Sequence, residues 1–155
     1  MTDFQGVAAG AGLRVCILVS RFNVIVTDRL LDGARTTLIE SGVNEDRLDV
    51  IWVPGAWELP AAASMASERG YDAMVALGCI IRGETAHFDH VSRAAVDGLA
   101  RLQLRTGIPI ALGILTPEDM SQAMARAGGD VGHAGVQAAE AALEMADLQT
   151  RLRSD

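Results

Sequence analysis

Residues 13–20, LRVCILVS, form a short apolar run that is followed by an amphipathic pattern ending at Gly42. The run is continuously apolar rather than alternating, which is typical of a strand buried on both faces of a parallel sheet. The apolar residues after it share one helical face: Val26, Leu30, Leu31, Ala34 and Leu38. Gly42 suits the left-handed position that ends many helices. The stretch from residue 13 to residue 42 therefore predicts a strand followed by a helix, the basic unit of an α/β fold.

The same alternation of strand and helix recurs along the rest of the chain. Three further apolar runs are typical of buried strands, at residues 48–53 (LDVIWV), 71–77 (YDAMVAL) and 108–115 (IPIALGIL). Helical patterns follow them at about residues 57–69, 84–106, 116–127 and 134–152. The order predicts a three-layer α/β/α sandwich around a four-stranded, mainly parallel sheet.

The helix expected at residues 116–127 has the clearest start signal. Thr116 is expected to be its N-cap, Pro117 its first residue, and Glu118 and Asp119 the acids of its first turn. Each residue type is favoured at that position of a helix.

Length and composition indicate one compact domain. The chain has 155 residues, of which 50% are hydrophobic and 21% are charged, so a full apolar core is expected. Residues 1–12 carry little core material and are expected to form an N-terminal arm that docks on a neighbour, or a frayed end, with residues 13–155 as the single domain.

The charge balance narrows the partners and the chemistry. Thirteen basic residues against twenty acidic ones give a formal charge of −7, which argues against nucleic acid or an anionic membrane as the main partner. All thirteen basic residues are arginines, so no enzyme lysine can act as a Schiff-base nucleophile. No apolar run approaches the roughly 20 residues that span a bilayer. Together with the absence of a basic, apolar leader in MTDFQGVAAG, this predicts a cytoplasmic protein.

The usual cofactor signals are missing. Gly10 and Gly12 precede the first strand instead of following it, so they form no dinucleotide fingerprint, and there is no P-loop. Cys16 and Cys79 each lie within an apolar segment and are expected to be buried free thiols rather than metal ligands. A cofactor-independent and metal-independent reaction, or a plain binding function, remains.

Distinctive residues directly follow the carboxyl ends of the predicted strands. Parallel sheets bind ligands at this edge. Phe22 is either a stacking platform for a planar ligand or a loop residue folded onto the core. Glu58 is either an acceptor for ligand hydroxyls or a solvated acid in the first turn of a helix.

A second group of candidates lies near helix ends. Glu84 and Thr85 open the expected third helix, where backbone N–H groups form either a phosphate site or an unliganded cap. His87 lies in the first turn of that helix, which favours a neutral imidazole able to transfer protons, although a structural histidine is the plainer interpretation. Arg126 ends a short helix and either binds phosphate or interacts with the helix dipole. No role is assigned to His90.

Taken together, five segments resemble lumazine synthase: RFN at 21–23, PGAWELP at 54–60, GCIIRGETAHFDHV at 78–91, GILTPEDMSQAMARAG at 113–128 and EAALEM at 140–145. The likeness covers nearly the whole chain. It implies a condensation of 5-amino-6-(D-ribitylamino)uracil with 3,4-dihydroxy-2-butanone 4-phosphate, yielding 6,7-dimethyl-8-ribityllumazine, phosphate and water. It implies no metal or organic cofactor, a flavodoxin-like fold, and a homo-oligomer that is a pentamer or a sixty-subunit icosahedral shell.

The resemblance also assigns roles by position. It implies His87 as the catalytic proton carrier and Phe22 as the residue that stacks on the pyrimidine. The other substrate-binding positions that it implies are Asn23, Ala56, Trp57, Glu58, Cys79, Ile80, Ile81, Glu84, Thr85, Leu112 and Arg126. Leu112 and Arg126 would come from the adjacent subunit, with Arg126 on the phosphate.

Four positions depart from the family pattern. Leu112 stands where phenylalanine is common, and Gln137 where an acid is common. His133 and Ala134 stand where asparagine and lysine are common. These departures bear on substrate affinity more than on reaction type. They leave open a non-catalytic cage that binds flavin or lumazine. An archaeal-type riboflavin synthase and a structural domain without ligand are further alternatives.

Overall fold

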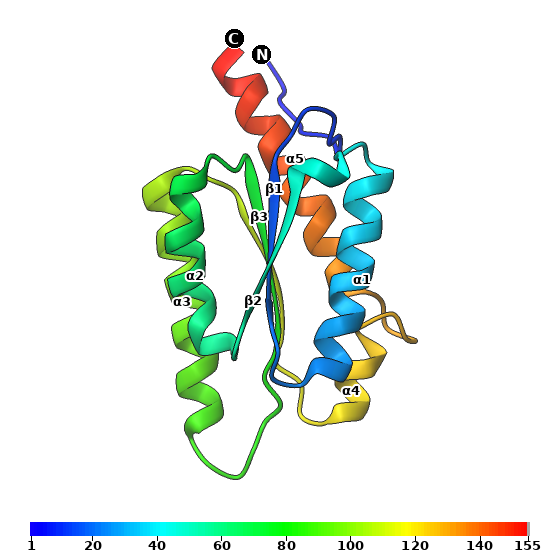
Figure 1. Cartoon of the computed structure of the whole chain (residues 1–155), viewed down its shortest axis with the longest axis vertical. Helices are drawn as coiled ribbons and strands as arrows, with labels where there is room; N and C mark the ends of the chain where they lie inside the picture. Colours follow the sequence, from blue (N-terminus) through cyan, green and yellow to red (C-terminus); the bar gives the residue numbers. More distant parts are fainter. Residues whose placement is uncertain (155) are drawn as a thin grey trace.

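The computed structural model describes residues 1–154 and shows a three-layer α/β/α sandwich (Figure 1). Its four strands are β1 (Val15–Ser20), β2 (Leu48–Val53), β3 (Ala73–Cys79) and β4 (Ile110–Leu115). They pair in the order β2-β1-β3-β4, and every pairing is parallel. The predicted sandwich is thus confirmed, and the sheet is fully parallel.

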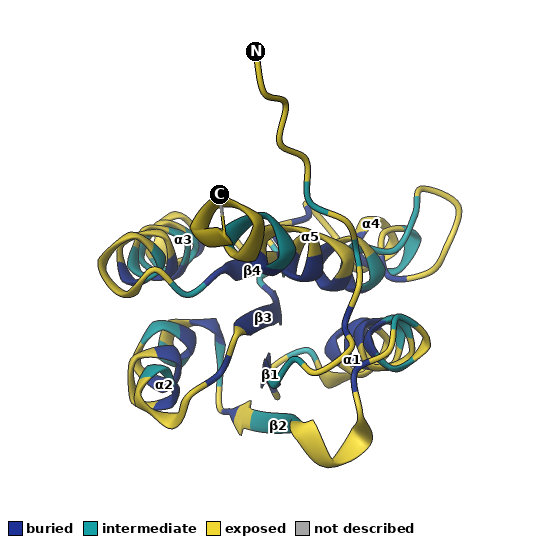
Figure 2. Cartoon of the chain, turned by 90° about the horizontal axis from the view of Figure 1, so that it is seen from above, coloured by how far each residue is buried: buried dark blue, intermediate teal, exposed yellow. Residues whose placement is uncertain are grey.

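Helices cover both faces of the sheet (Figures 1 and 2). One layer holds α2 (Leu59–Ala66) and α3 (His87–Thr106), and the other holds α1 (Val24–Glu40), α4 (Met120–Ala125) and α5 (Ala134–Ser154). Three short 3₁₀ helices, η1 (Glu45–Arg47), η2 (Ala56–Glu58) and η3 (Ser67–Arg69), flank β2 and α2.

The core is divided in two by the sheet. Alternate residues of a strand point to opposite faces, so Ile17 packs on the side of α1 and α5, whereas Leu18 packs on the side of α2 and α3. All residues of β1 and β3 are buried, as their continuous apolar character predicts. The two outer strands are less buried than β1 and β3, since Trp52 of β2 is 40% exposed and Leu112 of β4 is 51% exposed. An edge strand has a neighbour on one side only, which the composition of LDVIWV and IALGIL does not reveal.

Two helices begin later than the sequence predicts. Helix α4 has Asp119 as its N-cap, with Oδ1 accepting from the Gln122 N–H at 2.8 Å, so Thr116 and Pro117 precede the helix. Helix α3 begins at His87 rather than at Glu84. The segment before α4 is held at the end of the sheet, since the Pro117 carbonyl accepts from the Arg82 N–H at 3.0 Å.

The N-terminal residues run along α5 and then leave the body of the chain (Figure 2). The Val7 N–H donates to Asp147 Oδ2 at 2.9 Å, and Gly6 packs so closely on the Glu144 carbonyl that no Cβ would fit. Residues 1–5 are exposed. No helix among residues 1–154 is long and apolar enough to cross a membrane.

A polar cluster joins the starting ends of β1, β2 and β3. The Tyr71 hydroxyl donates to Asp49 Oδ2 at 2.5 Å, the Arg14 guanidinium bonds the same oxygen at 3.2 Å, and it also lies 4.7 Å from the Tyr71 ring centroid. The hydrogen bond from Tyr71, followed by the contacts with Arg14, lowers the pKa of Asp49 below its ordinary value of 3.8. A lowered carboxyl pKa stabilises the fold above that ordinary value, and the contribution is lost as pH falls through the folded-state pKa.

The Tyr71→Phe variant is expected to lose about 1 kcal/mol of unfolding free energy at neutral pH, an amount reduced because Asp49 is partly exposed. Urea unfolding at neutral and at acidic pH measures the effect. The difference from the parent chain should shrink as pH falls from 3.8 toward the lower pKa of the folded chain, through which the Asp49 carboxylate protonates. In an Asp49→Asn background, Tyr71→Phe should cost less; an equal cost in both backgrounds would contradict the charged hydrogen bond.

Candidate active site

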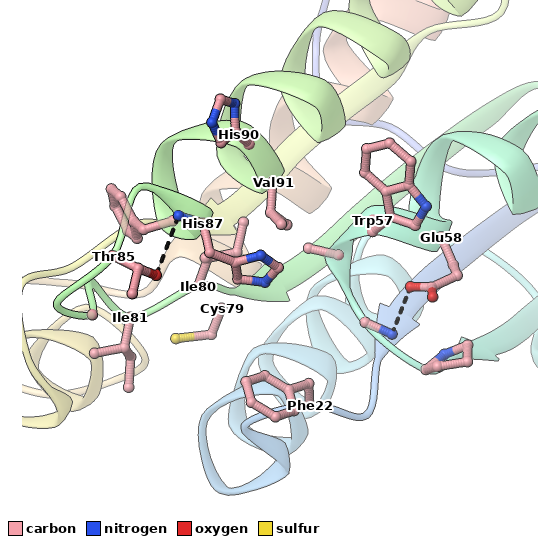
Figure 3. Close-up of a pocket in the computed structure, with 15 residues that line it drawn as sticks. Phe22, Trp57, Glu58, Cys79, Ile80, Ile81, Thr85, His87, His90 and Val91 are labelled. Carbon is pink, nitrogen blue, oxygen red and sulfur yellow. Dashed lines mark hydrogen bonds between the residues drawn. The ribbon is translucent and has the colours of Figure 1, made fainter.

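A pocket of about 820 Å³ opens at the carboxyl ends of β1, β2 and β3, beside the start of α3 (Figure 3). Nine of the predicted site residues line it: Phe22, Ala56, Trp57, Glu58, Cys79, Ile80, Ile81, Thr85 and His87. They come from four separate segments of the sequence. Parallel topology brings these segments to one edge because all four strands end there.

Two aromatic side chains lie at this pocket without being part of the core. Phe22 is 69% exposed and Trp57 is 62% exposed. In the close-up, Phe22 lies at the bottom of the group of lining residues, Trp57 at its upper right, and His87 to the left of Trp57 (Figure 3). Exposed rings at a concave site offer faces on which a planar ligand can stack. The geometry therefore favours the stacking interpretation of Phe22 over a loop residue folded onto the core.

The Glu58 carboxylate is fixed by its own turn. Its Oε2 accepts from the Gly55 N–H at 3.1 Å, which closes the 3₁₀ turn η2. This bond is drawn in Figure 3 and holds the carboxylate at the pocket wall. One oxygen is used in the turn, and the second is the acceptor that a ligand hydroxyl can reach.

The loop before α3 brings a hydroxyl and an imidazole to the same wall. The Thr85 Oγ1 lies 3.4 Å from the His87 backbone N–H, a long hydrogen bond that an incoming anion can replace. The first N–H groups of α3 have no partner within the helix, and the helix dipole favours negative charge there. Both side chains are exposed, with His87 directed to the pocket in Figure 3. A phosphate next to a proton carrier fits this arrangement.

Asn23 takes a different position from the one predicted. It has φ 60° and ψ 46°, a left-handed conformation unusual for a residue other than glycine, and caps α1. Its Nδ2 donates to the Cys79 carbonyl at 2.9 Å, which ties the end of β1 to the end of β3. The amide is thus engaged beneath the pocket rather than forming its wall. Glu84 also lies outside the lining, on the exposed part of the loop.

Leu112 and Arg126 do not join the other candidates within one chain. Leu112 lies in the middle of β4, and Arg126 is the exposed residue that ends α4. Neither lines the pocket.

The thiols are unreactive by environment. Cys16 and Cys79 are both buried and unpaired. Burial raises the pKa of Cys16 to about 12 and the pKa of Cys79 to about 11, so both are protonated at neutral pH. Cys79 therefore offers the pocket its backbone and its bulk rather than a nucleophile. Residues 1–154 contain no group of three or more His, Cys, Asp or Glu side chains placed to hold a metal ion.

Some lining residues were not singled out from the sequence: Pro54, Gly55, Gly83, Phe88, His90 and Val91. His90 and Val91 follow His87 by three and four positions, so all three share one face of α3. The spacing from His87 was the signal that could have identified His90. Phe88 gave no such signal, because it directly follows His87 and so lies on a different face of α3.

Fold and pocket together define a small-molecule-binding protein of the flavodoxin-like type, with its site at the carboxyl edge of a parallel sheet. Within this class the particular family is clear, since the model of the family described as 6,7-dimethyl-8-ribityllumazine synthase matches residues 12–150. The chain belongs to that family. The family consists of transferases of riboflavin biosynthesis that act on small molecules and form oligomers, and the predicted family is thereby confirmed.

Proposed function

We propose that this protein condenses 5-amino-6-(D-ribitylamino)uracil with 3,4-dihydroxy-2-butanone 4-phosphate to give 6,7-dimethyl-8-ribityllumazine, phosphate and water. The observation that carries the proposal is the pocket itself. It combines an exposed aromatic ring, a carboxylate, and a hydroxyl beside an imidazole at the start of a helix, supplied by Phe22, Glu58, Thr85 and His87. These groups match the three parts of the two substrates: a planar ring, a polyol chain and a phosphate.

Each part of the pocket has a defined task in this reaction. Phe22 stacks on the pyrimidine, and the backbone of residues 79–81 binds its edge. Residues 56–58 hold the ribityl chain, with Glu58 accepting from its hydroxyls. Glu84 and Thr85 hold the phosphate through backbone N–H groups and the Thr85 hydroxyl.

The bond changes need proton transfer rather than a cofactor. The substrate amine attacks the ketone carbon, and water leaves as the imine forms. A proton is then removed from C3 of the butanone as phosphate leaves C4. The resulting enol becomes a ketone, and the ribityl-bearing nitrogen attacks this carbonyl and closes the ring with loss of a second water. His87 carries protons between the nitrogen, oxygen and carbon centres. The amine belongs to the substrate, which agrees with a chain that has no lysine.

The site is completed by a second copy of the chain. Leu112 and Arg126 are exposed and lie outside the pocket of their own subunit. In the proposed assembly, a pentamer or a sixty-subunit shell, they reach the neighbour's pocket, and Arg126 binds the phosphate. The turn between the last two helices, residues 128–133, is as short as in shell-forming members of the family, which supports the shell. We place the protein in the cytoplasm, with small-molecule substrates and no nucleic-acid or membrane partner.

One mixing experiment tests the function. Purified protein is combined with both substrates, and lumazine fluorescence is followed against the uncatalysed rate. Formation no faster than in solution, with tight lumazine binding, would instead identify a non-catalytic cage. Conversion of lumazine to riboflavin would identify a riboflavin synthase. Sedimentation or negative-stain microscopy distinguishes the pentamer from the shell.

The Phe22→Ala variant is expected to raise the KM for the uracil substrate by about three- to tenfold, because stacking contributes about 0.5–1.5 kcal/mol beyond area burial. The KM for the phosphate substrate should stay nearly unchanged, since the ring lies at the pyrimidine part of the pocket. Steady-state kinetics with each substrate varied in turn provides the measurement. Phe22→Tyr keeps the ring and serves as the control. Equal effects on both substrates would indicate collapse of the loop instead.

A further inference from the structure

Arg82 lies where the chain leaves the sheet and enters the loop before α3. Up to this point the backbone is fixed by the parallel ladder. The Ile80 N–H donates to the Leu115 carbonyl at 2.8 Å, and the Arg82 N–H donates to the Pro117 carbonyl at 3.0 Å. Residues 83–86 are exposed and lie beyond the ladder. The position of this loop therefore depends on contacts made by the residues at its two ends.

The Arg82 side chain makes such contacts across the base of the loop. Its guanidinium carbon lies 4.5 Å from the centroid of the Phe88 ring, which is buried. One terminal nitrogen is 3.9 Å from Asp89 Oδ1. Residue 82 precedes the loop and residues 88 and 89 follow it, so the contacts of Arg82 with Phe88 and Asp89 form a clamp that joins the two ends of the loop.

A third contact connects this clamp to the next segment. Arg82 Nε donates to Glu118 Oε1 at 3.1 Å, just before the N-cap of α4. The guanidinium is thus held on one side by α3 and on the other by the segment that leads to Arg126. Planar geometry allows one arginine to stack on a ring and pair with a carboxylate at the same time, which lysine cannot do.

We propose that Arg82 is a positioning residue that closes the base of loop 83–86 and thereby sets the place of Thr85 and His87 in the pocket. Its side chain lies outside the pocket, whereas its neighbours Ile81 and Gly83 line it, so Arg82 acts from behind the wall. The inference rests on the proposed function, which assigns phosphate binding and proton transfer to residues of this loop and the start of α3.

Amide hydrogen exchange tests the clamp without any turnover. The Arg82→Ala variant should exchange the hydrogen-bonded amides at the two ends of the loop, residue 82 and His90, about five- to twentyfold faster, through loss of one ring contact and two exposed ion pairs. The amides of β3 and β4 should be unaffected. Arg82→Lys keeps the charge without the planar stacking, so its exchange rates should lie between those of the parent protein and those of Arg82→Ala. Arg47→Ala, an exposed arginine in η1 at the far end of the sheet, is the matched control.

Kinetics tests the consequence for the site. Arg82→Ala should raise the KM for the butanone phosphate by about five- to twentyfold and change the KM for the uracil by less than about twofold. Glu118→Gln, which keeps the acceptor oxygen and removes the charge, should show a smaller shift in the same direction. Unchanged loop exchange in Arg82→Ala, or equal shifts of both KM values, would overturn the proposal. Failure of the proposed function would show differently, as absence of lumazine formation by the parent protein, while exchange still decides whether the clamp exists.

Discussion

The His87→Ala variant is expected to turn over about 10²-fold more slowly than the parent protein while assembling normally. General acid–base help contributes about 10²–10⁴-fold, and the loss should lie at the low end because the condensation also proceeds in solution. His87 is exposed at the start of α3 and lines the pocket, so its removal leaves the core intact. Lumazine fluorescence gives kcat, and sedimentation gives the assembly state.

His90→Ala is the informative comparison. His90 lies one turn further along α3 and lines the same pocket. If His87 carries the protons, His90→Ala should leave kcat much closer to the parent value. A loss at His90 as large as that at His87 would move the proton carrier one turn along the helix. An unchanged kcat in His87→Ala would remove that residue from the mechanism.

The Arg126→Ala variant is expected to raise the KM for the phosphate substrate by about 10- to 100-fold, and far less for the uracil. A charge-assisted contact with phosphate contributes roughly 1.5–3 kcal/mol. Helix α3 offers the phosphate N–H groups but no full positive charge, and Ala134 replaces the lysine common in the family. Competition by inorganic phosphate, weakened in parallel, gives an independent measurement. Arg47→Ala provides the control for loss of a surface arginine.

Mixed assemblies decide which subunit supplies Arg126. If the residue serves the neighbour's pocket, subunits carrying Arg126→Ala and subunits carrying His87→Ala form some interfaces in which both side chains are intact. Co-assembled mixtures should then recover activity that neither variant has alone. Mixtures that exchange subunits and stay inactive would contradict the shared site and assign the phosphate to one chain.

The sequence predicted the layers of the fold well because burial and topology agree in β1 and β3, where apolar residues fill both faces. It failed where a distant contact decides the outcome. Thr116 and Asp119 both satisfy the preference for an N-cap. The Pro117 carbonyl, however, accepts from the Arg82 N–H and extends the ladder, so the helix begins only after Asp119. The residues around Pro117 give no indication of that hydrogen bond, because its donor lies more than thirty residues away in the sequence.

The candidate site shows the same division. Phe22, Glu58 and His87 could be found because each follows shortly after a strand, and parallel strands end at one edge. Asn23 is next to Phe22 in sequence, yet its left-handed backbone turns its amide to the Cys79 carbonyl. Arg126 depends on the surface of another subunit, which a single chain cannot provide.

The two buried thiols give the sheet an internal reporter of its own opening. Because burial keeps the pKa of Cys16 about 12 and that of Cys79 about 11, a thiol reagent at neutral pH finds almost no thiolate in the folded chain. Labelling must therefore wait for β1 or β3 to open, and its rate follows the population of the opened state. Cys16 lies within β1 and has no exposed surface, whereas Cys79 ends β3 and borders the pocket. Mass spectrometry of the two labelled sites would separate unfolding of the whole sheet from loosening at the ligand-binding edge.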